Sequence, residues 1–271
     1  MNSKLEKFKD PSYKPDENTK TEIEQLNKEG ESLSGFQLKF ADLKNADLVD
    51  ANLTSCDLKR ANLSNASMYG ANLEGADLFK ADLEGTNLKN ANLENTELLG
   101  ANFTNTKLHN VNWGEEGKII NELEAEKSQD SHVAQTKYKE AEEIYCAIRL
   151  TMQGQSLGDE ASTVFIREMV CKRKQYPKYS LFRIMSKFAD ITIGYGESLK
   201  RIIGSIFSVI FVSALLYGLE GVSYLGRTLG FFVDDLQQYG IWATLGDLFY
   251  FSVITFTTVG FGEITPIGPF G

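Results

Sequence analysis

Residues 41–55 read Ala-Asp-Leu-Lys-Asn-Ala-Asp-Leu-Val-Asp-Ala-Asn-Leu-Thr-Ser, a five-residue pattern written three times over. The pattern runs without a gap from Phe36 to Trp113, in about sixteen copies. In each copy a small residue precedes a large apolar one by two places, so both lie on one face of an extended segment. Because five is odd, a straight strand would turn every second Leu outward, so the chain must bend once per repeat. Four such bends close a square coil.

These repeats strongly resemble the pentapeptide-repeat family, over the whole of residues 36–113. The resemblance implies a right-handed quadrilateral β-helix of about four coils, stacked at about 4.8 Å to make a rod roughly 20 Å tall. The residues that would fill its centre are Leu43, Leu48, Leu53, Leu58, Leu63, Met68, Leu73, Leu78, Leu83, Leu88, Leu93, Leu98, Phe103 and Leu108. The large Phe103 and Trp113 predict a plug that protects the last coil from edge pairing.

The charges of the repeats bear on what they could bind. Some members of the family imitate DNA and bind topoisomerases, which needs a dense acidic face. Here the acidic side chains of the repeats are largely offset by Lys and Arg. The net charge of -9 also argues against a nucleic-acid partner. We therefore favour a structural spacer or a docking module for a cytoplasmic protein or ligand.

A second motif, Thr-Thr-Val-Gly-Phe-Gly-Glu, occupies residues 257–263. A dehydrated K⁺ ion needs a ladder of oxygens, which four copies of a short extended segment can supply from backbone carbonyls. Gly260 and Gly262 stand at alternate positions, where a positive φ carries no steric cost. The preceding residues 241–256 are too short to span a bilayer but can enter it halfway as a helix. The carboxyl end of that helix would favour cations.

This motif resembles the selectivity filter of two-helix potassium channels. Thr258, Val259, Gly260, Phe261 and Gly262 match the filter residue by residue, which implies ion-binding positions in a homotetramer with K⁺ as the permeant ion and no cofactor. Phe261 stands where many members carry Tyr, and Glu263 where Asp is commoner. We expect Tyr250 to reach Glu263 and, with Thr257, to support the filter.

Residues 202–219 contain no charged side chain and are long enough to cross most of the hydrocarbon core, at about 1.5 Å per residue. Basic residues precede this segment, so its start should face the cytoplasm. The loop 220–238 would then be external. A buried helix of a soluble domain is the alternative, although the segment is apolar on every face.

Residues 114–199 are predicted to link the two parts. A charged connector over 114–130 leads into a helix with an apolar seam, and a second helix follows over 159–175, with Val164, Phe165 and Met169 on one side. The seam consists of Ala134, Tyr138, Ala141, Tyr145, Ile148 and Met152. This hairpin either meets its copies in a tetramer or packs on itself.

The end of the linker approaches the membrane. Leu181, Ile184, Met185, Phe188 and Ile191 lie on one helical face, as expected for a helix on a membrane surface. Residues 192–197 read Thr-Ile-Gly-Tyr-Gly-Glu, which is also filter-like. No membrane span precedes this string, so we predict a turn there.

Residues 1–35 are predicted to form a polar tail with a short capping helix near 22–28. The amino terminus has no apolar core, so it is not a signal peptide. Cys56, Cys146 and Cys171 show no metal-ligand spacing, which favours reduced thiols in the cytosol. His109 and His132 are the only histidines, and neither belongs to a triad pattern. No enzyme activity is therefore expected.

The sequence thus predicts a multi-domain plasma-membrane protein whose β-helix lies in the cytoplasm. Its segments are residues 1–35, 36–113, 114–199 and 200–271, the last being an α-helical pore module. A channel of this type needs a second spanning helix after the filter, so we expect a truncated form of a multi-pass protein. The alternative is a non-conducting, membrane-anchored scaffold whose working part is the β-helix.

Overall fold

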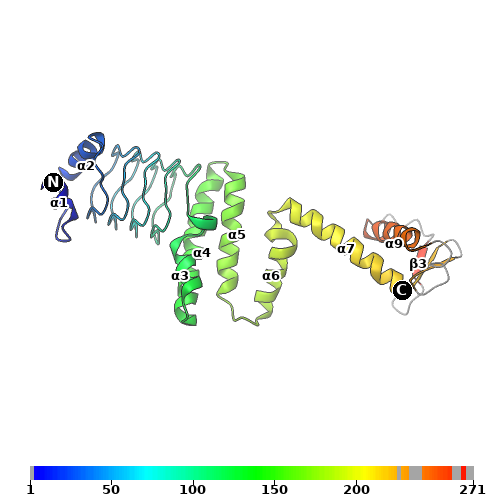
Figure 1. Ribbon diagram of the computed structural model, residues 1–271. Coiled ribbons are helices and arrows are strands. Elements are labelled where there is room, and N and C mark those ends of the chain that lie inside the picture. The colour runs from blue at the N-terminus through cyan, green and yellow to red at the C-terminus, as the bar shows by residue number, and fades with distance from the viewer. Residues whose placement is uncertain (1–2, 225–226, 232–239, 258–263, 267–271) are drawn as a thin grey trace. The chain divides into compact units, whose positions relative to one another are not determined.

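The structure is a computed structural model of the chain, and it describes residues 3–224, 227–231, 240–257 and 264–266. They fall into two compact units, Met1–Lys187 and Phe188–Gly271. The helices of the first unit are α1 (Ser3–Lys9), α2 (Thr19–Lys28), η1 (Glu115–Gly117), α3 (Ile120–Lys127), α4 (Ser131–Gly154) and α5 (Gly158–Lys174) (Figure 1). The helix α6 (Leu181–Ile193) crosses from one unit to the other. The second unit holds η2 (Gly194–Gly196), α7 (Leu199–Glu220), β1 (Val222–Tyr224), β2 (Arg227–Leu229), α9 (Ile241–Phe256) and β3 (Ile264–Pro266).

The repeats form parallel coils of 20 residues. Asp42 bridges Asn62, which bridges Asp82 in turn, and the series extends from Gln37 to Asn112. Backbone hydrogen bonds join the same positions, as where Leu43 N donates to Asn62 O at 2.8 Å. Because each repeat has five residues, a register of 20 places four repeats in every coil, as the sequence predicts.

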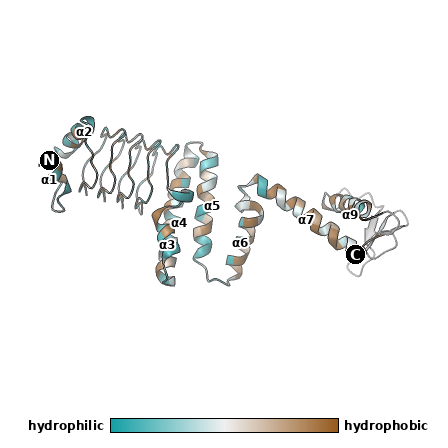
Figure 2. Ribbon diagram, viewed as in Figure 1, coloured by the Kyte–Doolittle hydropathy of each residue, from teal (hydrophilic) through white to brown (hydrophobic). Residues whose placement is uncertain are grey.

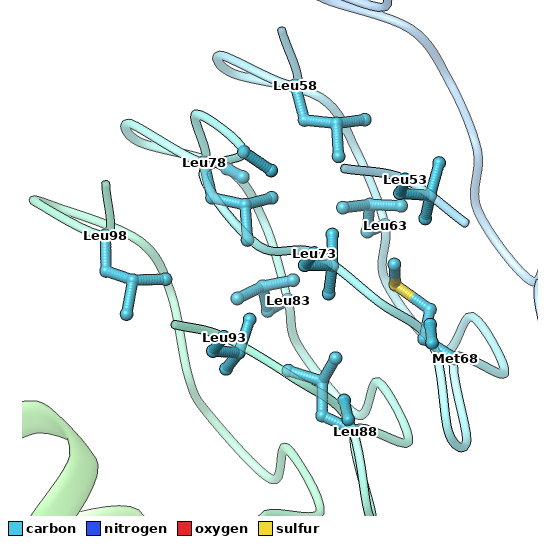
Figure 3. Close-up of a cluster of buried hydrophobic side chains, with 14 of the residues drawn as sticks. Leu53, Leu58, Leu63, Met68, Leu73, Leu78, Leu83, Leu88, Leu93 and Leu98 are labelled. Atoms are coloured by element: carbon cyan, nitrogen blue, oxygen red, sulfur yellow. The ribbon is translucent and has the colours of Figure 1, made fainter. Parts of the chain in front are cut away.

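Large apolar side chains fill the inside of the coils. Figure 3 shows those from Leu53 to Leu98 gathered there, one from each successive repeat. All of the predicted centre residues from Leu43 to Leu108 are at most 3% exposed. The core of the β-helix therefore comes from two positions of the repeat, the large apolar residue and the small residue two places before it, and their burial is the main source of its stability.

The small residue of each repeat, two places before the large apolar one, also joins adjacent coils at some positions. Where Ala is replaced by Thr, the hydroxyl donates to a carbonyl of the preceding coil. Thr86 Oγ1 donates to Leu63 O at 2.7 Å, and Thr106 Oγ1 donates to Leu83 O at 2.7 Å. These buried hydroxyls are satisfied, so the variants join adjacent coils rather than weaken the core.

The last residue of each repeat turns the corner with a positive φ. Most of these corners hold Gly or a short polar residue, such as Asn45 at φ 57° and Asn65 at φ 58°. Asn tolerates the left-handed region better than other non-glycine residues because its short polar side chain can bond locally. The corner column therefore accounts for the Asn, Asp, Ser and Gly at every fifth place.

The first coil is covered by α1 and α2, so the prediction of a polar tail is incomplete. Phe8 and Ile23 are fully buried, and Phe8 stacks on Phe36 with ring centroids 4.9 Å apart. Gln37 N donates to Phe8 O at 2.7 Å, which satisfies a backbone group at the coil edge. A segment too polar to fold alone is thus ordered by the apolar end of the coil stack.

The last coil is covered by the hairpin of α4 and α5. Thr151 Oγ1 donates to Phe103 O at 3.1 Å, and Leu108 N donates to Gln155 Oε1 at 3.4 Å. Trp113 is only partly buried. The predicted plug of Phe103 and Trp113 is therefore corrected, since helices supply most of the cover.

Within the hairpin, the seam of α4 packs against α3 and α5 of the same chain. The alternative in which the hairpin packs on itself is the one seen. The segment 114–130 is more than a connector, because α3 buries Ala125 and also Glu122. Its acidic composition hid this packing, since a buried carboxylate is uncommon.

Glu122 is fully buried among α3, α4 and α5. The Tyr145 hydroxyl donates to Glu122 Oε2 at 2.7 Å, and Arg167 Nη1 lies 3.6 Å from Oε1. Burial raises the pKa of the Glu122 carboxyl above its ordinary value. The ionised form is therefore disfavoured in the folded protein.

We expect the Glu122→Gln variant to change how stability depends on pH. Because the folded-state pKa is raised, the contribution of Glu122 is fully present below the unfolded pKa, about 4.3, and is lost as pH rises toward the folded value. Wild type should therefore lose stability relative to Glu122→Gln as the pH rises from about 4.3 through the raised pKa of the folded state. Thermal midpoints measured across this range test it. Glu143→Gln, at an exposed position of α4, is the control and should show no such trend. Equal pH slopes for wild type and Glu122→Gln would contradict the assignment.

The predicted surface helix is α6, and its apolar face is uncovered. Leu181, Ile184, Met185, Phe188 and Ile191 are between 56% and 69% exposed. The filter-like string at 192–197 contains η2, where Tyr195 takes φ 54° and Gly196 φ 93°. The predicted turn is thus confirmed.

Candidate functional site

The helix α7 is the one helix in the described ranges that is long and apolar enough to cross a membrane. Figure 2 shows hydrophobic residues along most of its length. Ser198 caps its start by accepting from Arg201 N at 3.4 Å, and Gly221 at φ 83° ends it. Only 17% of its most apolar window is buried inside the structure. The exposed side chains therefore require lipid or other protein around them.

The helix α9 has the bounds predicted for a pore helix. Its 16 residues end at Phe256, and Thr257 follows as the C-cap. Thr257 N and Thr257 Oγ1 both donate to Val253 O, at 2.9 Å and 2.8 Å, and the hydroxyl also lies 3.2 Å from Ile254 O, a carbonyl of the last helical turn. The negative end of the helix dipole thus lies immediately before residue 258.

A buried contact fixes α9 against α7. Ser252 Oγ donates to Ile210 O at 2.7 Å, and Tyr217 and Phe251 meet edge to face with centroids 4.7 Å apart. Leu248 of α9 is fully buried in the same cluster. Ser252 was not predicted as a contact residue, although a hydroxyl on an apolar helix often bonds to a neighbouring helix.

A three-stranded sheet, which was not predicted, lies beyond α7. β1 pairs with both β2 and β3, and Tyr224 pairs with Ile264. Phe231 N donates to Gly218 O at 2.7 Å, and a Cβ on Gly218 would stand 2.3 Å from the Phe231 ring. The described residues on either side of 258–263 are Thr257, the C-cap of α9, and Ile264, the first residue of β3.

Only two of the predicted site residues, Tyr250 and Thr257, lie within the described ranges. Tyr250 lies on α9 and is 50% exposed, and Thr257 caps that helix. The remaining site residues, Thr258, Val259, Gly260, Phe261, Gly262 and Glu263, lie outside the described residues. The contact between Tyr250 and Glu263 thus stays a prediction.

Ser252→Ala should loosen α9 from α7. The variant leaves the carbonyl of Ile210 without its buried donor, so we expect a loss of about 1 kcal/mol in unfolding free energy. Thermal unfolding of the full chain in detergent measures this loss. Ser208→Ala is the matched control, because the Ser208 hydroxyl donates to Gly204 O within its own helix and is exposed. Equal midpoints for the two variants would show that the bond contributes nothing.

Across the ranges that the structure describes, no group of three or more His, Cys, Asp or Glu side chains is placed to hold a metal ion. The features of the second unit are instead helix ends, backbone carbonyls and apolar surface.

Comparison with known families divides the chain in the same way. Residues 37–75 and 76–112 match the family of pentapeptide repeats, in eight copies of its model. Residues 221–271 match a family described as ion channel. No curated protein matches the chain.

Pentapeptide repeat proteins are among the solved structures similar to the chain. One from the cyanobacterium Cyanothece 51142 is 37% identical, covers 33% of this chain and 60% of its own, and has a TM-score of 0.32. Another, from the thylakoid lumen of Arabidopsis thaliana, is 33% identical over 28% of this chain and 48% of its own, with a TM-score of 0.21. The chain thus spans about half to three fifths of the length of these two structures.

Proposed function

Since the chain joins pentapeptide repeats to an ion channel segment, we propose that it is the subunit of a potassium-selective, homotetrameric channel. Conduction would pass through Thr258, Val259, Gly260, Phe261 and Gly262, with Tyr250, Thr257 and Glu263 supporting them. K⁺ is the permeant ion, and the proposal includes no cofactor, nucleic acid or enzymatic reaction.

One observation carries this proposal. A short apolar helix, α9, is fixed on a membrane-length helix and ends directly before the filter motif. Its carboxyl end would present partial negative charge to a cation at residue 258. A glycine-rich turn in a soluble protein has no need for either helix.

Exposed apolar surface supports an assembly in lipid. Phe207 and Phe211 of α7 and Trp242 of α9 are 60%, 55% and 83% exposed. Four copies around one axis would cover part of this surface, and bilayer lipid the rest. Lys200 and Arg201 at the start of α7 favour a cytoplasmic side for that end. The proposed location is the plasma membrane, with the repeats in the cytoplasm.

For the repeats we propose regulation or docking, in a right-handed, four-sided β-helix. Both ends of the coil stack are covered by helices, so a partner has to use the sides. The competing proposal is a membrane-anchored scaffold that passes no ions. The membrane-length helix α7 suits an anchor equally well.

Ion flux separates the two proposals. The full-length protein is reconstituted in liposomes, and K⁺ and Na⁺ fluxes are measured under the same gradient. A channel should pass K⁺ at least about 100-fold faster than Na⁺, because fixed carbonyls replace the K⁺ hydration shell. Flux no greater than that of protein-free liposomes would favour the scaffold. Equal K⁺ and Na⁺ flux would contradict selectivity while keeping a channel.

A further inference from the structure

One corner of the β-helix differs in chemistry from the other three. Residues 40, 60 and 80 stack above one another by the 20-residue register, and they are Phe, Arg and Lys. The preceding column adds Lys39, Lys59 and Phe79. Together these six residues are called the cationic edge.

The backbone at this corner is less favourable for its residues than at the others. Phe40, Arg60 and Lys80 have φ of 63°, 55° and 55°. Every other corner from residue 45 to residue 110 with a positive φ is Asn, Asp, Ser or Gly. A bulky side chain in the left-handed region is strained, since Cβ approaches the following carbonyl oxygen. Three such residues in one column therefore oppose the local preference that sets the rest of the pattern.

Three cations of this edge make cation–π contacts with its aromatic rings. Lys39 Nζ lies 5.3 Å and Arg60 Cζ 5.8 Å from the ring centre of Phe40, and Lys80 Nζ lies 5.1 Å from that of Phe79. Phe40 is 59% exposed. Among the described residues Lys39, Arg60 and Lys80 make no ion pair within 4.0 Å. Their charge is therefore open to a partner.

The carboxylates of the same face are already engaged. Asp57 accepts from Lys59 N at 3.1 Å and Asp77 from Phe79 N at 3.1 Å. Lys59 Nζ pairs with Asp77 at 2.8 Å, and Asp57 lies 3.9 Å away. Local negative charge is thus directed to the backbone and to Lys59, which leaves the other three cations without an opposing group.

We propose that the cationic edge binds an acidic segment of a partner protein, with aromatic or apolar residues between its carboxylates. The free cations of the edge would pair with the carboxylates, and Phe40 would take the ring or alkyl group. A flat anionic membrane fits less well. It would face Asp57, Asp77 and Glu97 across the whole side, whereas an extended segment touches the corner alone.

The test uses Phe40→Asn/Arg60→Asn/Lys80→Asn in the full chain, held in nanodiscs of phosphatidylcholine. Asn is the residue that the other corners prefer, so this variant should fold and its thermal midpoint should rise by about 3–6 °C. The probe is a fluorescent copolymer of glutamate and tyrosine, with binding followed by anisotropy. The variant should bind this probe at least about tenfold more weakly than wild type.

Lys44→Asn/Lys89→Asn is the matched control. Like the triple variant it removes two positive charges, but from exposed positions on other sides of the β-helix. It should change binding less than about twofold. Equal losses in the two variants would overturn the proposal, since only net charge would then matter. A falling midpoint in the triple variant would also overturn it, because the edge would then be needed for folding.

A last arm separates the partner from a membrane. Binding is repeated with vesicles of phosphatidylcholine containing about 30% phosphatidylserine. We expect wild type and the triple variant to bind them equally. Vesicle binding that depends on the cationic edge, without copolymer binding, would assign the surface to lipid instead.

Discussion

Leu63→Asp is expected to unfold the repeat domain. Leu63 is fully buried in the middle of the coil stack, and its neighbours 20 residues away in each direction, Leu43 and Leu83, are fully buried as well. The variant places a carboxylate among the buried apolar side chains of the coil interior, which costs about 4–5 kcal/mol or more. Whole domains are stable by only about 5–15 kcal/mol. Because coils are stabilised by their neighbours, the damage should spread along the stack.

Hydrogen–deuterium exchange over residues 36–113 of the full chain measures this effect. Wild type should show slow exchange at backbone groups that bridge coils, and Leu63→Asp should show loss of protection throughout the range. Val49→Asp is the control, since Val49 is 38% exposed and a surface charge changes stability by less than about 0.5 kcal/mol. Retained protection in Leu63→Asp would contradict a continuous core.

Gly260→Ala is expected to lower K⁺ flux by about 100-fold or more. The reason comes from the sequence: a carbonyl ladder needs alternate residues in a conformation that only glycine adopts without strain. In a tetramer the added methyl group would occur four times around one axis. Flux from reconstituted full-length protein, with cross-linking to show that the assembly is intact, measures the effect.

Gly246→Ala provides the matched glycine control. Gly246 lies inside α9, and a Cβ there would meet no atom within 4 Å. Alanine should leave flux unchanged and favour the helix by about 1 kcal/mol. Wild-type flux from Gly260→Ala would exclude residues 258–262 as the selectivity filter.

The β-helix could be predicted because its structural determinants lie within each five-residue repeat. The apolar column, the small column and the corner column are each set by one position in five, so the register follows from periodicity alone. The bounds of α9 were predicted for a similar reason, since Gly240 and the motif at 257–263 delimit an apolar segment. Local rules were sufficient in both places.

Elements that depend on distant contacts were missed. Phe8 is buried because it stacks on Phe36 at the end of the coils. The composition of residues 1–35 indicates only how much apolar surface that segment can bury by itself. Glu122 lies in the core because Tyr145 and Arg167, on two later helices, face it. The pairing of β1 with β3 joins residues about 40 positions apart, and strands of three residues are too short to show a pattern.

The 20-residue register also limits how such a gene can change in length. Deleting one repeat would rotate everything after it by one side, so Lys80 would leave the column of Arg60 and the hairpin would meet the last coil at the wrong orientation. Deleting four repeats would preserve both and shorten the stack by about 4.8 Å. Insertions and deletions that survive selection should therefore come in multiples of 20 residues, so the length of the domain changes only by whole coils.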